Sequence, residues 1–227
     1  MKVVIIGSGV MGSGIAIESV RAGYTTLLFD INSEALTKAE SYIHKQLEKA
    51  QSIGKITEEA RLAALKLLQF TDQFSELKAD FILEAIVEKL PVKQDLFARL
   101  ESQNSSDCIF ATNTSSIPIT QIASSLKHPE RLVGVHFFNP AHIMKLVEII
   151  SGAATDEKIA EKAFNWATKL GKTAVYAKDA PGFIVNRVAR HFYVESLKAL
   201  EEQVGDFEQM DRLMKVTGFK MGPFELM

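Results

Sequence analysis

The sequence predicts an α/β fold in which a doubly wound, mostly parallel sheet is followed by a short helical region. Three observations favour this fold. Short apolar runs, typical of buried parallel strands, alternate with longer amphipathic segments, typical of helices, over the first 180 residues. A glycine-rich turn joins the first apolar run to a helical segment, and from Phe183 onward only helical periodicity remains.

The opening stretch, residues 2–30, carries the most specific signal. Its first apolar run, residues 3–6, is too short for a helix and predicts a strand. The next glycines have the G-x-G-x-x-G spacing: Gly7, Gly9 and Gly12. A helix and a second strand follow, and that strand ends on Asp30. In this context the motif predicts a dinucleotide-binding unit of the Rossmann type, whereas glycines alone would only shape a tight turn.

Each part of this unit has a task in holding a dinucleotide. The first glycine allows the turn, the second lets a pyrophosphate approach the backbone, and the third lets helix and strand pack closely. The first helical turn, with Val10 and Met11, offers N–H groups to the pyrophosphate. Asp30 is expected to bind the ribose hydroxyls, and residues 31–34 contain no arginine for a 2′-phosphate. NAD is therefore favoured over NADP.

The segment after the second strand predicts an insertion. Two helices are expected before the next strand, over about 33–50 and 57–68. A crossover between two strands needs only one helix. The two helices therefore predict an inserted helical hairpin. Lys38, Lys45 and Lys49 share the face opposite the apolar stripe; a solvated surface is the simpler interpretation, and contact with an anionic ligand is the alternative.

Five further strands complete the predicted sheet. They are expected over residues 80–86, 108–112, 133–138, 145–150 and 173–177, with helices from about Pro91 and over 156–170. The polar cluster 113–116, which begins with Asn113, follows one of these strands. Ligands of such sheets bind beyond the carboxyl ends of the strands, so the cluster is expected to face the cofactor cleft.

A turn over residues 179–182 precedes a long helix from Phe183 to about Glu202. The predicted domains are therefore 1–182, which binds the dinucleotide, and 183–227, the start of a helical domain. The 45 residues after Gly182 are too few to hold a core alone.

Composition excludes several classes of protein. A net charge of −2 gives no overall attraction to nucleic acid or to an anionic membrane. The single Cys108 lies in an apolar run and is expected to be buried, and five scattered histidines show no metal-ligand spacing. No apolar run approaches membrane-spanning length, and the first strand begins at residue 2, so a cytoplasmic protein without a leader peptide is expected.

His136 and Glu148 are polar residues inside otherwise apolar strands. A buried carboxylate is costly unless it is paired, so the two side chains are expected to meet. A histidine held by a carboxylate suits a general base that removes a hydroxyl proton while hydride leaves the same carbon. A core histidine that only hydrogen-bonds the next strand is the alternative. Ser115 and Asn186, at a strand end and a helix start, would hold a substrate oxygen or merely cap a turn or helix.

Six stretches resemble the L-3-hydroxyacyl-CoA dehydrogenases, particularly the bacterial 3-hydroxybutyryl-CoA type. They run in order over nearly the whole chain: GSGVMGSGIA, ILEAIVEKLPVKQDLF, ATNTSSIPIT, GVHFFNPAHIMKLVEII, KDAPGFIVNR and MGPFEL. The resemblance implies oxidation of the 3-hydroxyl of a short-chain acyl-CoA to the 3-keto thioester, with hydride passing to NAD.

The resemblance also implies roles for residues. His136 is the catalytic base, Glu148 orients it and stabilises its charged form, and Ser115 and Asn186 contact the reacting end of the substrate. Ser115 also lies beside the nicotinamide. Glu88 and Lys93 match cofactor-contacting positions, although a surface ion pair is the simpler interpretation of both.

In the family the inserted hairpin binds the CoA moiety, and Lys49 or Lys55 would serve there. His142 lies where relatives usually carry an apolar residue or proline, and is expected to be a loop residue, not a second base.

Relatives continue through further helices that complete the second domain and form a homodimer, so a chain ending at Met227 resembles a shortened form. The alternatives are a dehydrogenase of a sugar acid such as L-gulonate and a non-catalytic NAD-binding protein.

Overall fold

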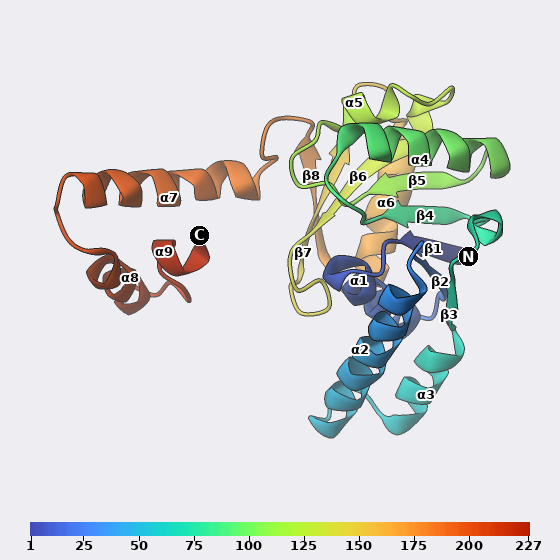
Figure 1. Ribbon diagram of the computed structural model, residues 1–227, viewed down its shortest axis with the longest axis horizontal. Helices are drawn as coiled ribbons and strands as arrows, with labels where there is room; N and C mark the ends of the chain where they lie inside the picture. Colours follow the sequence, from blue (N-terminus) through green and yellow to red (C-terminus); the bar gives the residue numbers. More distant parts are fainter. The chain divides into compact units, whose positions relative to one another are not determined.

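The computed structural model describes residues 1–227, which form two compact units, Met1–Ala180 and Pro181–Met227 (Figure 1). The strands are β1 (Lys2–Ile6), β2 (Thr25–Phe29), β3 (Leu68–Thr71), β4 (Phe81–Glu84), β5 (Ile109–Thr112), β6 (Leu132–Phe137), β7 (Leu146–Ser151) and β8 (Thr173–Lys178). The helices of the first unit are α1 (Val10–Arg21), α2 (Ser33–Ser52), α3 (Glu58–Lys66), α4 (Leu90–Gln103), α5 (Ile119–Ala123) and α6 (Glu157–Lys169).

All eight strands form one sheet in the order β3-β2-β1-β4-β5-β6-β7-β8. Every neighbouring pair is parallel except β6 and β7, which are antiparallel. The order reverses between β1 and β4, so the chain winds outward in both directions from this point. The predicted doubly wound α/β fold is confirmed.

Aromatic contacts show how helices cover both faces of the sheet. Phe81 of β4 stacks on Trp166 of α6, with ring centroids 4.5 Å apart. On the other face, Phe110 of β5 contacts Phe97 of α4 at 5.9 Å. Helix α1 lies on the same side as α6 and shares its core cluster. The central strands are buried on both faces, which explains their continuous apolar runs.

One predicted boundary is wrong, and one strand was not predicted. The helix expected to run to Leu68 ends at Lys66, and Leu68–Thr71 forms β3 at the edge of the sheet. The inserted pair of helices, α2 and α3, therefore lies between β2 and β3. An edge strand is only partly buried, so its sequence, LQFT, lacks the continuous apolar run of a central strand.

The second unit contains α7 (Val185–Glu201), α8 (Phe207–Val216) and α9 (Pro223–Leu226). Asp206 caps α8, and Gln209 completes the capping box. The carboxylate of Asp211 accepts hydrogen bonds from the backbone N–H groups of Phe224 and Glu225, which joins α8 to α9. Within the whole chain, no helix combines the length and the apolar character that a membrane crossing requires.

Candidate active site

The glycine-rich turn joins β1 to α1 at the reversal of the strand order. Gly7 has a φ of +100°, and a Cβ there would lie 2.6 Å from the carbonyl oxygen of Ala85. A Cβ at Gly12 would lie only 1.8 Å from the carbonyl oxygen of Gly7. A Cβ at Gly9 would meet nothing within 4 Å. The first and third glycines therefore serve the fold, whereas the space over Gly9 and the N-terminus of α1 fits a pyrophosphate.

Asp30 lies at the end of β2, next to this turn. Its Oδ2 accepts hydrogen bonds from both the backbone N–H and the hydroxyl of Ser8, each at 2.8 Å, and its Oδ1 accepts one from the N–H of Asn32. These bonds fix the carboxylate beside the turn. Sequence reasoning found Asp30 but not Ser8, whose position inside the glycine motif was the available signal.

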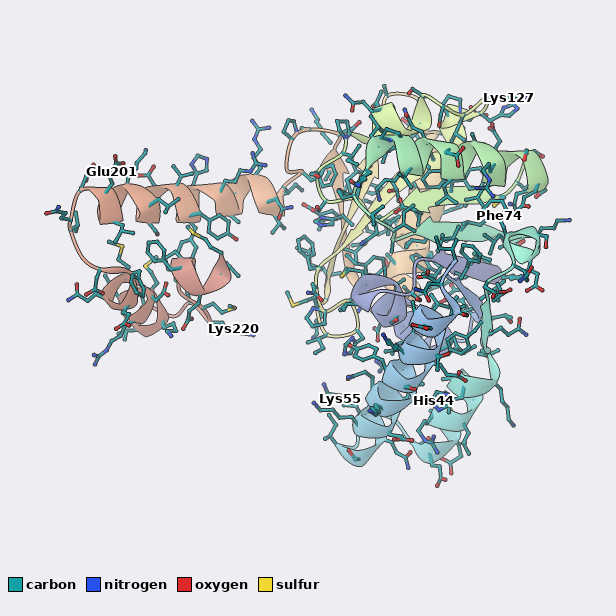
Figure 2. The ribbon with its side chains drawn as sticks, viewed as in Figure 1. His44, Lys55, Phe74, Lys127, Glu201 and Lys220 are labelled. Carbon is teal, nitrogen blue, oxygen red and sulfur yellow. The ribbon has the colours of Figure 1, made fainter.

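A cleft of about 540 Å³ opens beyond the ends of β1, β2 and β4. Gly7, Gly9 and Asp30 line it, together with Phe74 and Arg99. The guanidinium of Arg99 lies 4.1 Å from the centre of the Phe74 ring, and Figure 2 labels Phe74 beside the short segment that leads into β4. The cleft stands at the carboxyl ends of strands where their order reverses, which is where open α/β sheets bind ligands.

His136 and Glu148 lie directly opposite each other in the antiparallel β6–β7 pair. Opposed residues project to the same face, so the register itself brings their side chains together. His136 Nδ1 is 2.7 Å from Glu148 Oε2, and both residues are buried, Glu148 completely. An ionised carboxylate only accepts hydrogen bonds, so Nδ1 carries the proton of this contact.

Asn113 connects the polar cluster after β5 to the histidine strand. Its Oδ1 accepts a hydrogen bond of 2.9 Å from the backbone N–H of Phe137, the residue after His136. The ring of Phe138 lies 4.6 Å from the His136 ring, measured between centroids. Both contacts hold the chain just after His136, at the end of β6.

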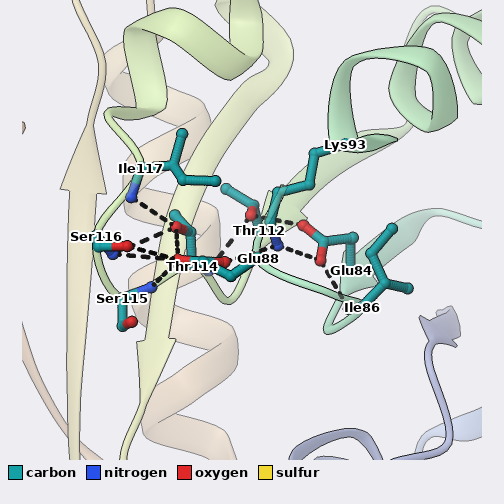
Figure 3. Close-up of polar contacts among 9 residues, drawn as sticks. All are labelled: Glu84, Ile86, Glu88, Lys93, Thr112, Thr114, Ser115, Ser116 and Ile117. Atoms are coloured by element: carbon teal, nitrogen blue, oxygen red, sulfur yellow. Dashed lines mark hydrogen bonds and ion pairs between the residues drawn. The ribbon is translucent and has the colours of Figure 1, made fainter. Parts of the chain in front are cut away.

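Glu88 organises the turn that carries Ser115 (Figure 3). Its Oε1 accepts hydrogen bonds from the Thr114 hydroxyl, from the Ser116 hydroxyl and from the backbone N–H groups of Ser115 and Ser116. Burial by itself would raise the pKa of Glu88, but the Thr114 hydrogen bond and the charge of Lys93 outweigh it and lower that pKa. Glu88 is therefore an ionised anchor for this turn.

Lys93 is not part of a surface ion pair, and that interpretation is wrong. Its side chain is only 1% exposed, and its Nζ lies 2.5 Å from Glu84 Oε1 and 3.1 Å from Glu88 Oε2. Glu84 is completely buried and also accepts hydrogen bonds from the Thr112 hydroxyl and the Ile86 N–H (Figure 3). A buried ammonium needs such partners because desolvation is costly.

Sequence reasoning missed Glu84. The signal was present, because Glu84 is a charged residue inside the apolar run FILEAI, as Glu148 is inside KLVEII. What the sequence did not supply was a partner, since Lys93 lies nine positions further on, in another element.

The other predicted residues are distributed over the molecule. Lys49 lies near the end of α2, and Lys55 lies at the tip of the hairpin formed by α2 and α3 (Figure 2). Asn186 lies in the first turn of α7, in the second unit. Cys108 is buried, as expected, and burial raises the pKa of its thiol to about 12.

Comparison with known proteins is consistent along the whole chain. Residues 2–180 match the family model described as "3-hydroxyacyl-CoA dehydrogenase, NAD binding domain", and residues 182–227 match "3-hydroxyacyl-CoA dehydrogenase, C-terminal domain". The first match confirms NAD as the predicted cofactor.

Individual relatives agree with this result. The chain is 46% identical to a 3-hydroxyadipyl-CoA dehydrogenase of Escherichia coli strain K12, over 99% of this chain and 48% of the relative. It is 37% identical to a probable 3-hydroxybutyryl-CoA dehydrogenase of Bacillus subtilis strain 168, over 99% of this chain and 79% of the relative.

A crystal structure titled as 3-hydroxybutyryl-CoA dehydrogenase from E. coli K12 superposes with a TM-score of 0.96 at 46% identity. The superposition covers 100% of this chain and 48% of the other. The chain thus spans about half the length of the E. coli proteins that it matches.

Proposed function

The chain belongs to the 3-hydroxyacyl-CoA dehydrogenase family, and from this premise we propose that it oxidises short-chain L-3-hydroxyacyl-CoA to 3-ketoacyl-CoA, and catalyses the reverse. Relatives named for 3-hydroxybutyryl-CoA and 3-hydroxyadipyl-CoA support a short acyl chain. We assign residues 1–182 to the NAD-binding domain and residues 183–227 to the start of a helical domain.

The His136–Glu148 pair carries the proposal. Because Nδ1 donates to Glu148, the neutral imidazole holds its lone pair on Nε2. That nitrogen takes the proton of the substrate's 3-hydroxyl, and Glu148 stabilises the imidazolium that results. The electron pair of the C3–H bond leaves with hydrogen as hydride, so the C3–O bond becomes a carbonyl. Bound NAD supplies the acceptor of that hydride.

The groups at the reversal of the strand order fit this cofactor. Gly9, Val10 and Met11 present the open backbone and N–H groups for the pyrophosphate, and Asp30 presents a fixed carboxylate for the ribose. Asn113, Ser115 and the Glu88–Lys93 pair shape the neighbouring strand ends.

Three further roles come from the family resemblance and stay proposals. Ser115 and Asn186 would hold the reacting oxygen of the substrate, and Lys49 or Lys55 would contact CoA. Alanine substitutions at the first two should lower kcat. Lysine-to-alanine substitutions at the other two should raise the KM of the acyl-CoA and leave kcat unchanged, since distant contacts bind ground and transition states alike.

The test is turnover of acetoacetyl-CoA with NADH, followed by NADH absorbance, for the wild type and His136→Gln. Loss of a general base costs about 10²- to 10⁴-fold in kcat, whereas NADH affinity should stay within about twofold. His128 is an exposed histidine whose side chain pairs with Glu130, and His128→Gln is the matched control, which should keep full activity.

Other outcomes discriminate the alternatives. Full activity of His136→Gln would remove this residue from the mechanism. Turnover of L-gulonate in place of any 3-hydroxyacyl-CoA would indicate a sugar-acid dehydrogenase. Tight NADH binding without turnover of any substrate would indicate a non-catalytic NAD-binding protein.

A further inference from the structure

The loop over residues 138–145 joins the strand of His136 to the strand of Glu148, and it packs against α1 (Figure 1). Within the loop, the backbone N–H groups of Ile143 and Met144 donate to the carbonyl of Pro140. The loop therefore connects the strand of His136 to the strand of Glu148. Contacts that hold the loop in place also affect the position of the imidazole.

Lys172 holds this loop by hydrogen bonds to its backbone carbonyls. Its Nζ donates to the carbonyl oxygens of Ala141 at 2.6 Å and Met144 at 3.1 Å. The side chain is 3% exposed, and Nζ lies 3.0 Å from Glu18 Oε2. An ammonium has three N–H donors, and these three acceptors use all of them.

Glu18 ties the same ammonium to α1. It is buried in the last turn of the helix, and its Oε1 also accepts from the guanidinium of Arg21 at 2.8 Å. The Glu18–Lys172 pair thus connects the helix whose N-terminus faces the cofactor cleft to the loop between the catalytic strands. A buried ion pair of this kind adds little net stability by itself. Its position between α1 and the loop therefore calls for an explanation other than stability.

Gly14 gives independent support. A Cβ at this position would lie 3.1 Å from the Cβ of Ala141 and 3.4 Å from the backbone nitrogen of His142. The loop therefore approaches α1 as closely as a residue without a side chain permits. The dinucleotide motif uses Gly7, Gly9 and Gly12 and does not require glycine at position 14.

We propose that Lys172 and Glu18 are positioning residues for the His136–Glu148 pair. By clamping loop 138–145 onto α1, they fix the imidazole relative to the helix that holds the cofactor's pyrophosphate. This inference rests on the proposed function for its kinetic consequence, but the clamp itself has a readout that does not require turnover.

The experiment compares Lys172→Met and Glu18→Gln with Lys162→Met, an exposed lysine on α6. Hydrogen exchange of the Ile143 and Met144 amides should accelerate about tenfold or more in both clamp variants and not in the control, because local opening becomes easier. At a temperature where all variants are folded, kcat should fall about tenfold to a hundredfold, as expected for a small misplacement. The NADH dissociation constant should stay within about twofold, since no cofactor contact changes.

Each outcome decides a different point. Unchanged exchange and unchanged kcat in folded Lys172→Met would overturn the clamp. Faster exchange with unchanged kcat would show a purely structural role and would also overturn the positioning proposal. Absence of turnover in the wild type would refute the proposed function, while the exchange result would still test the clamp. If Lys172→Met does not fold, Gly14→Ala, which displaces the loop by a few tenths of an ångström, replaces it and carries the same expectations in milder form.

Discussion

Two completely buried glutamates lie in the same sheet, on strands separated by β5 and β6, and each has a basic partner. Glu148 on β7 accepts from His136 at 2.7 Å, and Glu84 at the end of β4 accepts from Lys93 at 2.5 Å. The geometry of the two pairs is similar. Their partners differ in chemistry, because a neutral imidazole that donates from one ring nitrogen keeps an acceptor lone pair on the other, whereas an ammonium has only donors.

This difference separates a group that can move a proton from groups that hold the fold. Lys93 connects Glu84 to Glu88, and Glu88 binds four donors of the turn over residues 114–116. Nothing in that chain of contacts needs to change charge during a reaction. A buried carboxylate is thus a poor indicator of catalysis by itself, and the identity of its partner is the better one.

The largest expected effect comes from two glycines of the turn between β1 and α1. They again separate a residue that serves the fold from a residue of the proposed site. Gly12→Ala should yield no folded protein, because the new Cβ would lie 1.8 Å from a backbone oxygen that cannot move aside. Gly9→Ala should fold, with a loss of unfolding free energy below about 1 kcal/mol, the usual cost of alanine in place of a favourable N-cap residue. Its NADH affinity should fall at least about tenfold, because the methyl group fills the space that the pyrophosphate needs. Circular dichroism and fluorescence titration with NADH measure the two effects.

Gly23→Ala is the control, since Gly23 has a φ of +87° and lies outside the cleft. It should lower stability through backbone strain and leave NADH affinity unchanged. Unaltered NADH binding by Gly9→Ala would contradict the placement of the pyrophosphate.

Lys93→Met tests the comparison of the two glutamates directly. It leaves Glu84 buried without a cation, so the unfolding free energy should fall by about 3–5 kcal/mol in denaturant titrations. His136→Gln should cost less stability, because glutamine still donates a hydrogen bond to Glu148. Lys89→Met, on an exposed lysine just before α4, is the control and should be neutral.

Adding Glu84→Gln to Lys93→Met should recover part of the loss, because no charge then stays buried. A small loss of unfolding free energy in Lys93→Met, together with an unfolded His136→Gln, would contradict this comparison. The Glu148–His136 pair would then be the one that holds the fold.

The sequence predicted what depends on burial and on short spacing. Apolar runs located the central strands, and Thr25–Phe29 forms β2 as expected. The same reasoning found His136 and Glu148, because a polar residue in a buried strand needs a partner, and the next strand offered one. The edge strand β3 was missed because half of it faces away from the core.

Contacts between distant elements could not be read from the sequence. Lys172 and Glu18 are separated by more than 150 residues, and nothing in their local sequence indicates that they meet. A surface ion pair is the simpler interpretation of Lys93 from sequence, because lysine on an amphipathic helix is usually exposed. Its burial follows from the packing of α4 against the ends of β4 and β5, which periodicity does not determine.

The smallest expected effect concerns acid stability and the role of Glu88 as a fixed charge. Its pKa is lowered in the folded protein, since the hydrogen bond from Thr114 and the charge of Lys93 outweigh burial. A carboxyl with a lowered pKa stabilises the fold fully above its ordinary value of 4.5, and this contribution is lost as the pH falls through the lowered value. The difference in unfolding free energy between wild type and Glu88→Gln should therefore be constant from about pH 7 to 5 and shrink below pH 4.5.

Asp95→Asn, which removes an exposed carboxylate on the helix that follows Glu88, is the matched control. Its difference from the wild type should be close to zero throughout, because an exposed pair with Arg99 contributes little. A Glu88→Gln difference that grows as the pH falls would mean that Glu88 takes up a proton more readily in the folded protein than in the unfolded chain. The turn that carries Ser115 would then be held by a neutral carboxyl, and the role of Glu88 as a fixed charge would fail.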